Sequence, residues 1–315
     1  MSELRNHDGG WLATACAEIA AGRPVVLASI IGVKGSAPRD VGAHMVIGAE
    51  DIWGTIGGGQ LEFDAMRLAR QMIAKDPPEA WTRRDMRMAL GPDLGQCCGG
   101  QVRLLLEVLD QRALPLLQTH TDAETLIHPL TTGAPLHAAA PEAGPEYRLD
   151  EGGFVAPVIS PRRPVFVYGA GHVGRALVGQ LVPLGLDVHW VDVAADRFPT
   201  TAPDGVRIIP AAEPEIIAAH APVTAFHIVM TYSHAMDEAI CARILQRGQF
   251  ARLGLIGSQT KAARFRRRFA KMGIAPASID RLVCPVGIAQ ITGKAPPYVA
   301  LSIAAGIALW QEEST

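Results

Sequence analysis

The 315-residue sequence has little charge and no strong excess of either sign. Its formal net charge is −2, and Asp, Glu, Lys and Arg make up 19% of the chain, below the roughly 25% typical of soluble domains. This balance gives no global attraction to nucleic acid or to an anionic membrane. Apolar residues reach 49%, so disorder of the whole chain is also excluded. At roughly 150 residues per domain, the length suggests about two domains.

The sequence also lacks a hydrophobic run long enough to cross a bilayer. The longest apolar stretch, Val299 to Trp310, spans about 12 residues where about 20 are needed, and it contains Ser302 and Gly306. The first residues, Met1 to Asp8, are polar and carry no apolar signal core. We therefore expect a cytoplasmic protein that does not enter a membrane.

Cysteine is scarce and occurs in an odd number, five, of which two are adjacent, Cys97 and Cys98. Neighbouring cysteines rarely bridge each other because disulfide geometry is strained there, so a reducing compartment fits better than a disulfide framework. The sequence has no C-x-x-C motif for thioredoxin-like exchange and no second cysteine pair to complete a tetrahedral structural zinc site. Cys16 and Cys241 are expected to pack on helices, and Cys284 is also expected to be structural.

The adjacent pair lies in a glycine-flanked loop, Gly95 to Gly100. Backbone N–H groups of such a loop can lower the pKa of a thiol. A thiolate is a nucleophile, a sulfur acceptor and a ligand for soft metals. Two interpretations stay open at this point: a reactive thiol at Cys97 or Cys98, or an inert buried pair.

Composition changes near the middle of the chain, and no internal repeat is evident. Prolines and glycines accumulate between Pro129 and Pro164, with few periodic apolar runs among them. We interpret residues 111–162 as a connector with one or two short strands. It separates an N-terminal domain, residues 1–110, from a C-terminal domain, residues 163–315.

The C-terminal domain alternates between strand and helix patterns, which predicts a Rossmann-type, doubly wound parallel sheet of the α/β class. The predicted strands are 165–168, 188–191, 225–230 and 253–256, and the predicted helices are 173–184, 213–220, 235–247 and 260–272. The N-terminal domain is expected to be α/β or α+β. Its predicted helices are 11–21 and 60–75, and its predicted strands are 25–31, 44–47, 52–56 and 102–109.

Gly169, Gly171 and Gly174 form a G-x-G-x-x-G motif that follows a predicted strand and opens a predicted helix. Such glycines let the backbone approach a phosphate, and the helix N-terminus offers free N–H groups. His172 is a candidate ligand contact or a structural hydrogen-bonding residue. Asp192 ends the next predicted strand, where a carboxylate can accept hydrogen bonds from the hydroxyls of a ribose or similar polyol. The motif predicts a site for a nicotinamide dinucleotide or for another phosphate-bearing ligand.

Gly57, Gly58 and Gly59 run from a predicted strand into a predicted helix. Consecutive glycines cost conformational entropy, so we expect either a close backbone approach or an anion-binding nest of N–H groups. Glu62 in the first helical turn weighs against the nest because its charge would repel a bound anion. Arg39, in a loop after a buried strand, is either an ordinary solvated side chain or a grip for a phosphate or carboxylate.

The segment Thr231 to His234 follows a predicted strand of the C-terminal domain. Ligands of doubly wound sheets bind beyond the carboxyl ends of the strands, so His234 and Asp237 are candidate site residues, although Ser233 also explains part of the segment as a helix N-cap. A basic stripe at helical spacing follows, which is either a solvated face or a surface for an acidic partner or a ligand phosphate. Its members are Lys261, Arg264, Arg268 and Lys271.

Taken together, these segments resemble the xanthine dehydrogenase accessory protein family (XdhC/CoxI) over most of the chain apart from the connector. The resemblance rests on residues 35–39, 42–45, 54–59, 61–62 and 95–100, and on 169–174, 254–258, 285–288 and 302–305. The glycine triplet, the Cys-Gly-Gly segment and the Ile-Gly-Ser segment in this order are much more specific than a lone G-x-G-x-x-G. One departure is that Val193 and Ala194 follow Asp192, where members often have Asp-x-Arg.

The resemblance implies a molybdenum cofactor chaperone and not an enzyme. Such a protein binds the molybdopterin form of the cofactor and supports replacement of an oxo ligand by a sulfido ligand, with sulfur from a cysteine desulfurase. It then passes the cofactor to the molybdenum subunit of xanthine dehydrogenase. The Cys-Gly-Gly of the family falls on Cys98, with Cys97 as its neighbour, and either thiol is the implied metal contact. A homodimer fits the family.

We expect both domains to hold this cofactor jointly, with its phosphate on residues 169–174 and a thiol facing the metal. The candidate cofactor-binding residues are Arg39, Gly57, Gly58, Gly59, Cys97, Cys98, Gly169, Gly171, His172, Gly174, Asp192 and His234.

Two other classes of function stay open. An oxidoreductase that uses NAD explains the G-x-G-x-x-G motif but not the N-terminal glycine and cysteine segments, and only His172 and His234 are plausible proton donors for it. A pure assembly scaffold binds the dehydrogenase and the desulfurase without touching the cofactor.

Overall fold

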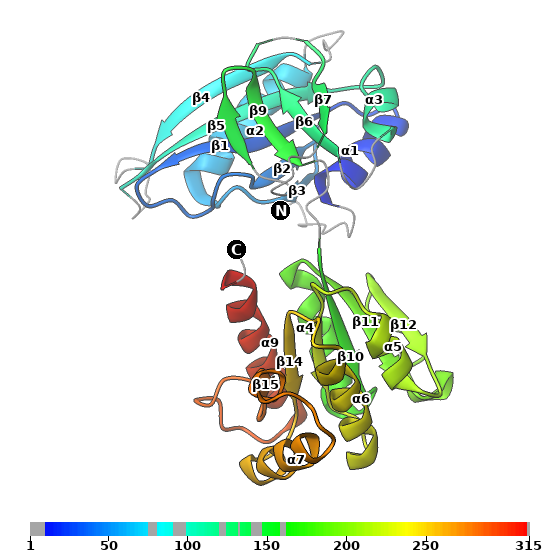
Figure 1. Ribbon diagram of the computed structural model, residues 1–315. Coiled ribbons are helices and arrows are strands. Elements are labelled where there is room, and N and C mark those ends of the chain that lie inside the picture. The colour runs from blue at the N-terminus through cyan, green and yellow to red at the C-terminus, as the bar shows by residue number, and fades with distance from the viewer. Residues whose placement is uncertain are drawn as a thin grey trace. The chain divides into compact units, whose positions relative to one another are not determined.

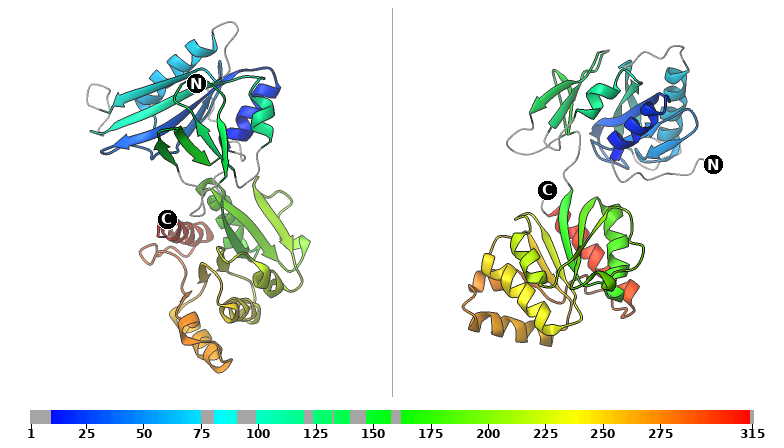
Figure 2. Two further views of the ribbon diagram at one scale, coloured as in Figure 1. Left: turned by 45° about the horizontal axis from the view of Figure 1, so that its top comes forward. Right: turned by 90° about the vertical axis from the view of Figure 1, so that its right-hand side faces the viewer.

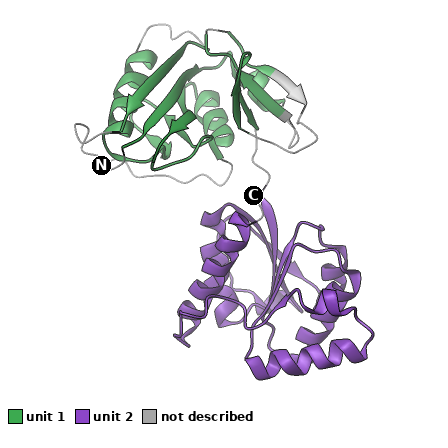
Figure 3. Ribbon diagram, turned by 60° about the vertical axis from the view of Figure 1, so that its left-hand side comes forward, with its two compact units in different colours: residues 1–161 green, residues 162–315 purple. Residues whose placement is uncertain are grey.

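The computed structural model describes residues 10–74, 81–90, 99–119, 124–131, 133–139, 147–157 and 162–313. The chain divides into two compact units, Met1–Pro161 and Arg162–Thr315 (Figure 3). The predicted start of the C-terminal domain at residue 163 lies next to this boundary. Among the described residues, no helix is both long and apolar enough to cross a membrane.

The first unit is built on a five-stranded antiparallel sheet with the strand order β3-β2-β1-β5-β4 (Figure 1). Its strands are β1 (Val25–Lys34), β2 (His44–Ile47), β3 (Ile52–Gly54), β4 (Arg83–Ala89) and β5 (Gln101–Leu109). β1 is the central strand and is buried over most of its length, as its continuous apolar run predicts.

Helices cover both faces of this sheet. α2 (Gly59–Ile73) packs on one face through Leu61, Ala65, Ala69 and Met72, which are all buried. These residues recur at helical spacing, so the predicted apolar stripe is confirmed. On the other face, α1 (Gly10–Ala20) and α3 (Leu114–Gln118) pack with β1 and β5.

The segment interpreted as a connector is more structured than expected. It contributes α3 and a four-stranded antiparallel sheet with the order β7-β6-β9-β8. Phe154 and Ala156 of this sheet are buried against Ile31 and Leu105 of the five-stranded sheet. Its strands are only three to five residues long, and prolines and glycines are frequent in the sequence between them, which is why the composition resembles that of a linker. The strands are β6 (Glu124–His128), β7 (Leu136–Ala139), β8 (Arg148–Asp150) and β9 (Gly153–Pro157).

The second unit holds a six-stranded parallel sheet with the order β12-β11-β10-β13-β14-β15. The predicted Rossmann-type sheet is therefore confirmed. β11 and β12 follow one another on one side of β10, and β13, β14 and β15 follow one another on the other side. The chain therefore changes its direction of progress across the sheet between β10 and β13, and doubly wound sheets bind ligands at such a point. The strands are β10 (Arg163–Tyr168), β11 (Leu186–Asp192), β12 (Val206–Pro210), β13 (Phe226–Val229), β14 (Arg252–Leu255) and β15 (Leu282–Val283).

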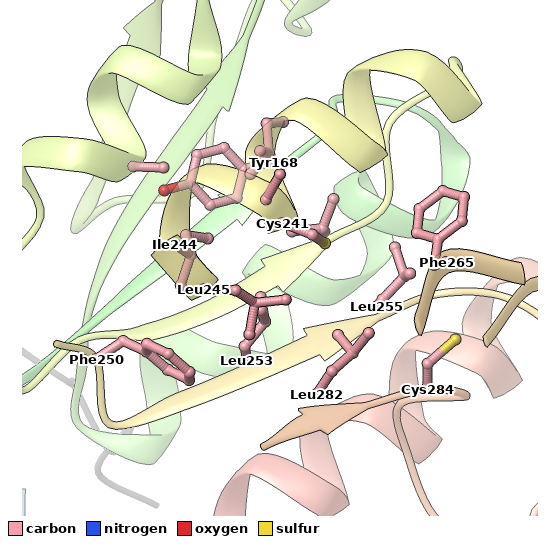
Figure 4. Packing of buried hydrophobic residues seen from close by; sticks show 14 of the residues in the cluster. Tyr168, Cys241, Ile244, Leu245, Phe250, Leu253, Leu255, Phe265, Leu282 and Cys284 are labelled. Atoms are coloured by element: carbon pink, nitrogen blue, oxygen red, sulfur yellow. The ribbon is translucent and has the colours of Figure 1, made fainter. Parts of the chain in front are cut away.

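Helices cover both faces of this parallel sheet (Figure 2). The side chains of β10 alternate between the two cores that result. Val165 and Val167 pack with helices α4 and α9, whereas Phe166 and Tyr168 pack with α5, α6 and α7. Figure 4 shows part of the second core, including Tyr168 and Cys241. The helices are α4 (His172–Leu181), α5 (Pro214–His220), α6 (His234–Arg247), α7 (Gln259–Lys271), α8 (Pro276–Ile279) and α9 (Pro296–Glu312).

Candidate functional site

The loop of residues 35–39, which follows β1, is the meeting point of three glycine-containing segments. A Cβ atom at Gly57 would overlap the side chain of Pro38, and a Cβ atom at Gly100 would overlap the carbonyl oxygen of Ser36. A side chain does not fit at either position, because the ring of Pro38 lies against Gly57 and the backbone of Ser36 lies against Gly100. We call this arrangement of residues 35–39, 57–59 and 99–100 the glycine cluster.

Arg39 lies in the glycine cluster, and its side chain is exposed. A Cβ atom at Gly57 would lie 3.7 Å from the Cγ atom of Arg39, so the base of the arginine rests on the glycine triplet. Cys97 and Cys98 lie outside the described residues, and their proposed contact with a metal stays a prediction. In the sequence they directly precede Gly99, the first described residue of this segment of the glycine cluster.

The carboxylate of Glu62 binds backbone N–H groups at the start of the glycine triplet. Its Oε1 atom accepts hydrogen bonds from the backbone N–H groups of Ile56, Gly57 and Gly58 at 2.9, 3.2 and 2.9 Å. The same atom accepts a hydrogen bond of 2.5 Å from the hydroxyl of Thr55. The N–H groups do form a nest, but the anion in it is a side chain of the same chain. A direct contact of these glycines with a ligand phosphate stays a prediction, and it requires Glu62 to withdraw.

A buried ionic cluster, not predicted from the sequence, lies where β5 meets β6. Glu107 accepts a hydrogen bond from the Nε atom of Arg83, and its Oε1 atom is 3.2 Å from Nδ1 of His128. Burial acts to raise the pKa of Glu107, but His128 and Arg83 together lower it below its usual value. Arg83 also donates a hydrogen bond of 2.8 Å to the carbonyl oxygen of Thr131. The cluster therefore ties the five-stranded sheet to the four-stranded one.

His44, on β2, is a structural histidine of the first unit. Its Nδ1 atom lies 2.9 Å from the hydroxyl of Ser29, and its ring centroid lies 5.8 Å from that of Trp11. Its Nε2 atom is shielded from water and has no hydrogen-bond partner among the described residues. Burial of the ring, assisted by the charge of His128, lowers the pKa of His44 to about 3. The ring is therefore neutral at physiological pH.

In the second unit, the G-x-G-x-x-G loop joins β10 to α4. A Cβ atom at Gly169 would overlap the carbonyl oxygen of Met230, and one at Gly174 would overlap the carbonyl oxygen of Gly169. By contrast, nothing lies within 4 Å of a Cβ atom at Gly171, which is the N-cap of α4, and His172 beside it is exposed. The outer glycines thus serve packing, and the middle one leaves the backbone open to a ligand.

Asp192 fastens this loop from the end of β11. The residue is only 4% exposed, and its Oδ2 atom accepts a hydrogen bond of 2.6 Å from the N–H of Ala170. Its Oδ1 atom accepts a hydrogen bond of 2.7 Å from the N–H of Val193 and lies 3.6 Å from Nε of Arg197. Both oxygens are therefore engaged within the protein, which weighs against the predicted contact with ribose hydroxyls.

A pocket of about 460 Å³ opens at the carboxyl ends of β13 and β14, where α6 and α7 begin. His234, which is exposed, lines it as the sequence predicts for a cleft residue. Ser233 is the N-cap of α6 and accepts a hydrogen bond of 3.4 Å from the N–H of Met236. The pocket is lined by Thr231, Tyr232, His234, Asp237, Ile256, Gly257, Ser258, Thr260, Lys261 and Arg264.

Lys261 forms a buried ion pair on the wall of this pocket. Its Nζ atom lies 2.6 Å from Oδ2 of Asp237 and donates a hydrogen bond of 2.9 Å to the carbonyl oxygen of Ile256. The Oδ1 atom of Asp237 accepts hydrogen bonds from the N–H and the hydroxyl of Thr231. A Cβ atom at Gly257 would lie 2.7 Å from Cδ of Lys261, so the glycine makes room for the lysine stem.

The basic stripe predicted on α7 is therefore not one solvated face. Lys261 is turned inward, and Arg268 pairs with Glu238 at 2.8 Å. Arg264 lines the pocket and has no carboxylate partner within the described part of the chain. Lys271, at the end of the helix, is exposed. The periodic spacing was visible in the sequence, but the inward turn of Lys261 depends on Asp237 of another helix.

A second pocket, of about 610 Å³, shares Ile256 and Gly257 with the first. It is lined mainly by the segment 285–294 and by Val299 and Ser302 of α9. Ser302 accepts a hydrogen bond of 2.8 Å from the N–H of Ile288, which holds this segment on α9. The pocket contains few charged groups, and sequence reasoning did not predict it.

The three cysteines in the described residues are poor thiolate candidates. Burial raises the pKa of Cys16 and of Cys284, and it raises that of Cys241 well above the usual value. Figure 4 shows Cys241 and Cys284 within the apolar core. Within the ranges that the structure describes, no group of three or more His, Cys, Asp or Glu side chains could hold a metal ion.

Comparisons with known proteins match both units. The family model described as the XdhC Rossmann domain matches residues 165–307, and that described as the XdhC and CoxI family matches residues 18–84. The uncharacterized protein YqeB of Escherichia coli strain K12 is 24% identical over 286 residues, which are 90% of this chain. The chain spans only 43% of the length of that relative.

A solved structure from Bacillus halodurans, described as a xanthine dehydrogenase, shares the fold. Its TM-score is 0.76 at 23% identity, and the match covers 100% of this chain and 97% of the other. The two family models together cover about two thirds of the sequence, including the glycine triplet and the G-x-G-x-x-G motif, whereas the cysteine segment 95–100 lies between the two matched ranges. The chain belongs to the XdhC and CoxI family.

Proposed function

We propose that the protein carries the molybdenum cofactor, in its molybdopterin form, during the maturation of xanthine dehydrogenase. Family membership suggests the maturation role. The observation that carries the proposal is the glycine cluster: Gly100, which follows Cys97 and Cys98 by three and two residues in the sequence, packs against Ser36 of the loop that bears Arg39. We infer that a thiol of this pair, a soft nucleophile, acts together with the exposed guanidinium of Arg39.

The chemistry of the cargo suits the groups that the chain offers. Molybdopterin carries a phosphate, hydrogen-bonding pterin edges and a dithiolene-bound metal. A thiolate of Cys97 or Cys98 suits the metal end, and Arg39 suits an anionic group. In the second unit, the open backbone at Gly171 and the adjacent His172 suit the phosphate. Each contact is our assignment to these residues.

The proposed role requires two partners. A cysteine desulfurase would supply the sulfur that replaces an oxo ligand, and the molybdenum subunit of xanthine dehydrogenase would receive the cargo. A carrier must release what it binds, so we expect moderate affinity and no permanent covalent bond. The protein itself would act as a chaperone and would not catalyse turnover of a substrate.

Cofactor retention tests the proposal directly. The purified protein is incubated with molybdenum cofactor released under anaerobic conditions, passed over a desalting column and analysed for molybdenum and pterin. We expect both in the protein fraction, and we expect Cys98→Ala and Cys97→Ala to lower their amount. Cys16→Ala, which removes a half-buried helical thiol, is the matched control. If the wild-type protein leaves the cofactor free, or if both variants retain it fully, the proposal fails.

The hydrogen bonds of Asp192 weigh against the alternative of an NAD-dependent oxidoreductase. Such an enzyme would use this carboxylate for the ribose hydroxyls, and here each of its oxygens already accepts a hydrogen bond, from the N–H of Ala170 or of Val193. Titration with NAD, followed by fluorescence, separates the two. Tight NAD binding without retention of molybdopterin would favour the oxidoreductase.

A further inference from the structure

We propose that the pocket at the carboxyl ends of β13 and β14 binds a phosphomonoester of a planar heterocycle, with the phosphate on Lys261 and Arg264 and the ring near Tyr232. The site lies one strand beyond the G-x-G-x-x-G loop. None of its lining residues comes from that loop, so it would be a second ligand site of the same unit.

The charges on the pocket wall favour a dianion. Lys261 and Arg264 stand one turn apart at the start of α7, and both line the pocket. The hydroxyls of Ser258 and Thr260 lie on the same wall. The N-termini of α6 and α7 add partial positive charge at the same place. Two cationic side chains and these hydroxyls match the charge and the acceptor oxygens of a phosphomonoester.

The one carboxylate of the pocket lining does not compete for this charge. Asp237 is only 1% exposed, and its two oxygens are engaged by Lys261 and by the N–H and hydroxyl of Thr231. Asp237 therefore acts on the lysine and not on a ligand. Its ion pair holds the ammonium group on the pocket wall, and two of the three ammonium protons are used, by Asp237 and by the carbonyl of Ile256. The third proton is available to a ligand oxygen.

The local sequence keeps the lysine in this place. Its stem runs across Gly257, where a Cβ atom would lie 2.7 Å from its Cδ atom and 3.3 Å from its Cβ atom. Gly257 has no left-handed backbone angle that would itself require glycine. The close approach of the lysine is thus the reason that the structure offers for a glycine here. Arg264 differs, because no carboxylate of the described residues neutralises it.

The size of the pocket and the exposure of Tyr232 point to a ligand larger than a bare oxyanion. A volume of about 460 Å³ falls in the range of small-molecule sites. Tyr232 lines the pocket with 68% of its surface exposed, and the guanidinium of Arg197 lies 4.7 Å from its ring centroid. A planar ring stacked on this tyrosine would cover an apolar surface that water now contacts. Nucleotides and pterin phosphates both have the required chemistry.

Isothermal titration of the full-length protein tests this inference. GMP is the nucleotide probe, neopterin monophosphate is the pterin probe, and guanosine lacks the phosphate. We expect one or both phosphomonoesters to bind at submillimolar concentration and guanosine to bind at least about tenfold more weakly. The two probes tell us which source of the phosphomonoester the pocket prefers. Cofactor retention is not the readout, so a failure here differs from a failure of the proposed function.

Two variants of α7 make the test specific. Arg264→Gln removes an exposed charge without breaking an ion pair, and it should weaken phosphomonoester binding about tenfold or more. Lys271→Gln removes an exposed charge at the other end of the helix and should change binding less than about twofold. Lys261→Met is not used, because it would remove a pocket charge but also leave the buried Asp237 without its ion-pair partner, which can unfold the unit.

Three results would overturn the inference. The first is that neither phosphomonoester binds below about 1 mM to the wild-type protein. The second is that Arg264→Gln binds both probes as tightly as the wild type. The third is that Gly171→Asp abolishes binding while Arg264→Gln retains it, which would assign the ligand to the glycine loop.

Discussion

The two glycine loops that lead from a strand into a helix differ in what fills their amides. In the first unit, Glu62 of the following helix accepts hydrogen bonds from the N–H groups of Ile56, Gly57 and Gly58. In the second unit, Asp192 of a neighbouring strand accepts a hydrogen bond from the N–H of Ala170, and no atom lies within 4 Å of a Cβ atom at Gly171. One loop is closed by a carboxylate of its own helix, and the other is fastened at its base and left open at its tip.

The comparison shows that a glycine run does not by itself indicate a ligand site. Both runs satisfy the same requirement, which is a backbone that turns tightly and points its N–H groups to one side. The two loops differ in the position of the acidic residue that accepts hydrogen bonds from those N–H groups. Where the acid lies within the next helical turn, the nest is used for folding, and where it lies on another strand, part of the nest stays open.

The largest effect is expected at Gly174. Gly174→Ala places a methyl group against the carbonyl oxygen of Gly169, so the loop and α4 must move apart. We expect a loss of more than about 3 kcal/mol in the free energy of unfolding, measured by urea denaturation. Gly179→Ala, on an exposed position of the same helix with its nearest neighbour 3.9 Å away, is the control and should be neutral or stabilising. Equal effects of the two changes would contradict the packing role of Gly174.

The closed loop is tested by Glu62→Ala. The change removes the acceptor of three backbone N–H groups and of the Thr55 hydroxyl, so we expect the first unit to lose about 2 to 3 kcal/mol. Asp64→Ala, which removes a surface ion pair of the same helix, should cost less than about 1 kcal/mol. Added phosphate should partly restore the stability of Glu62→Ala, because the vacated nest can accept an anion. A variant as stable as the wild type would show that Glu62 does not close the loop.

The two loops also differ in backbone angle at a glycine whose Cβ atom would meet no neighbour, and a pair of alanine substitutions can measure the effect of this difference. Nothing lies within 4 Å of a Cβ atom at Gly58 or at Gly171. Gly58 has a φ of 76°, whereas Gly171 has a φ of −72°, which any residue adopts. Gly58→Ala should therefore cost about 2 kcal/mol and Gly171→Ala less than about 0.5 kcal/mol in urea unfolding. Similar costs would mean that the angle at Gly58 is not the source of the difference.

Periodic segments were predictable from the sequence. The apolar stripe of α2 repeats at helical spacing, and the alternation of strands and helices predicts the parallel sheet, which is confirmed. β4 was missed because five of its seven residues are charged or exposed in the sequence Arg-Arg-Asp-Met-Arg-Met-Ala. The strand forms by pairing with β5, where Arg83 lies opposite Glu107, 24 residues away, and such a distant partner cannot be recognised from the local sequence.

The candidate site was less predictable because its geometry depends on contacts between distant residues. The spacing of Lys261 indicates a helix face, but its inward direction comes from Asp237 of α6. Glu62 was expected to repel an anion, and it is instead the anion that the glycine triplet binds. In both cases the sequence gives the type of group, and only the fold gives its partner.

The smallest expected effect concerns a property that the two units share, a buried neutral histidine. Burial lowers the pKa of His44 to about 3 in the first unit and that of His227 to about 3 in the second. Their unfolded-state pKa is about 6.5, so below that value the unfolded chain binds more protons than the folded one. The stabilisation from each neutral ring is therefore complete above about pH 6.5 and declines as the pH falls toward 3. At pH 5.5 each unit should have lost about 1.4 kcal/mol relative to pH 7.5.

Hydrogen exchange separates the units, because peptides of β1 report on the first and peptides of β13 on the second. His227→Gln should flatten the pH dependence of β13 and leave that of β1 unchanged. His189→Gln is the control for the loss of a histidine from the same sheet, since His189 lies on the neighbouring β11, stacked on Phe166 at 4.4 Å and 2.9 Å from Asp187. If β1 and β13 respond alike to acid, the two units share this property although their glycine loops are filled differently. If only one responds, acid sensitivity follows the unit and not the buried histidine.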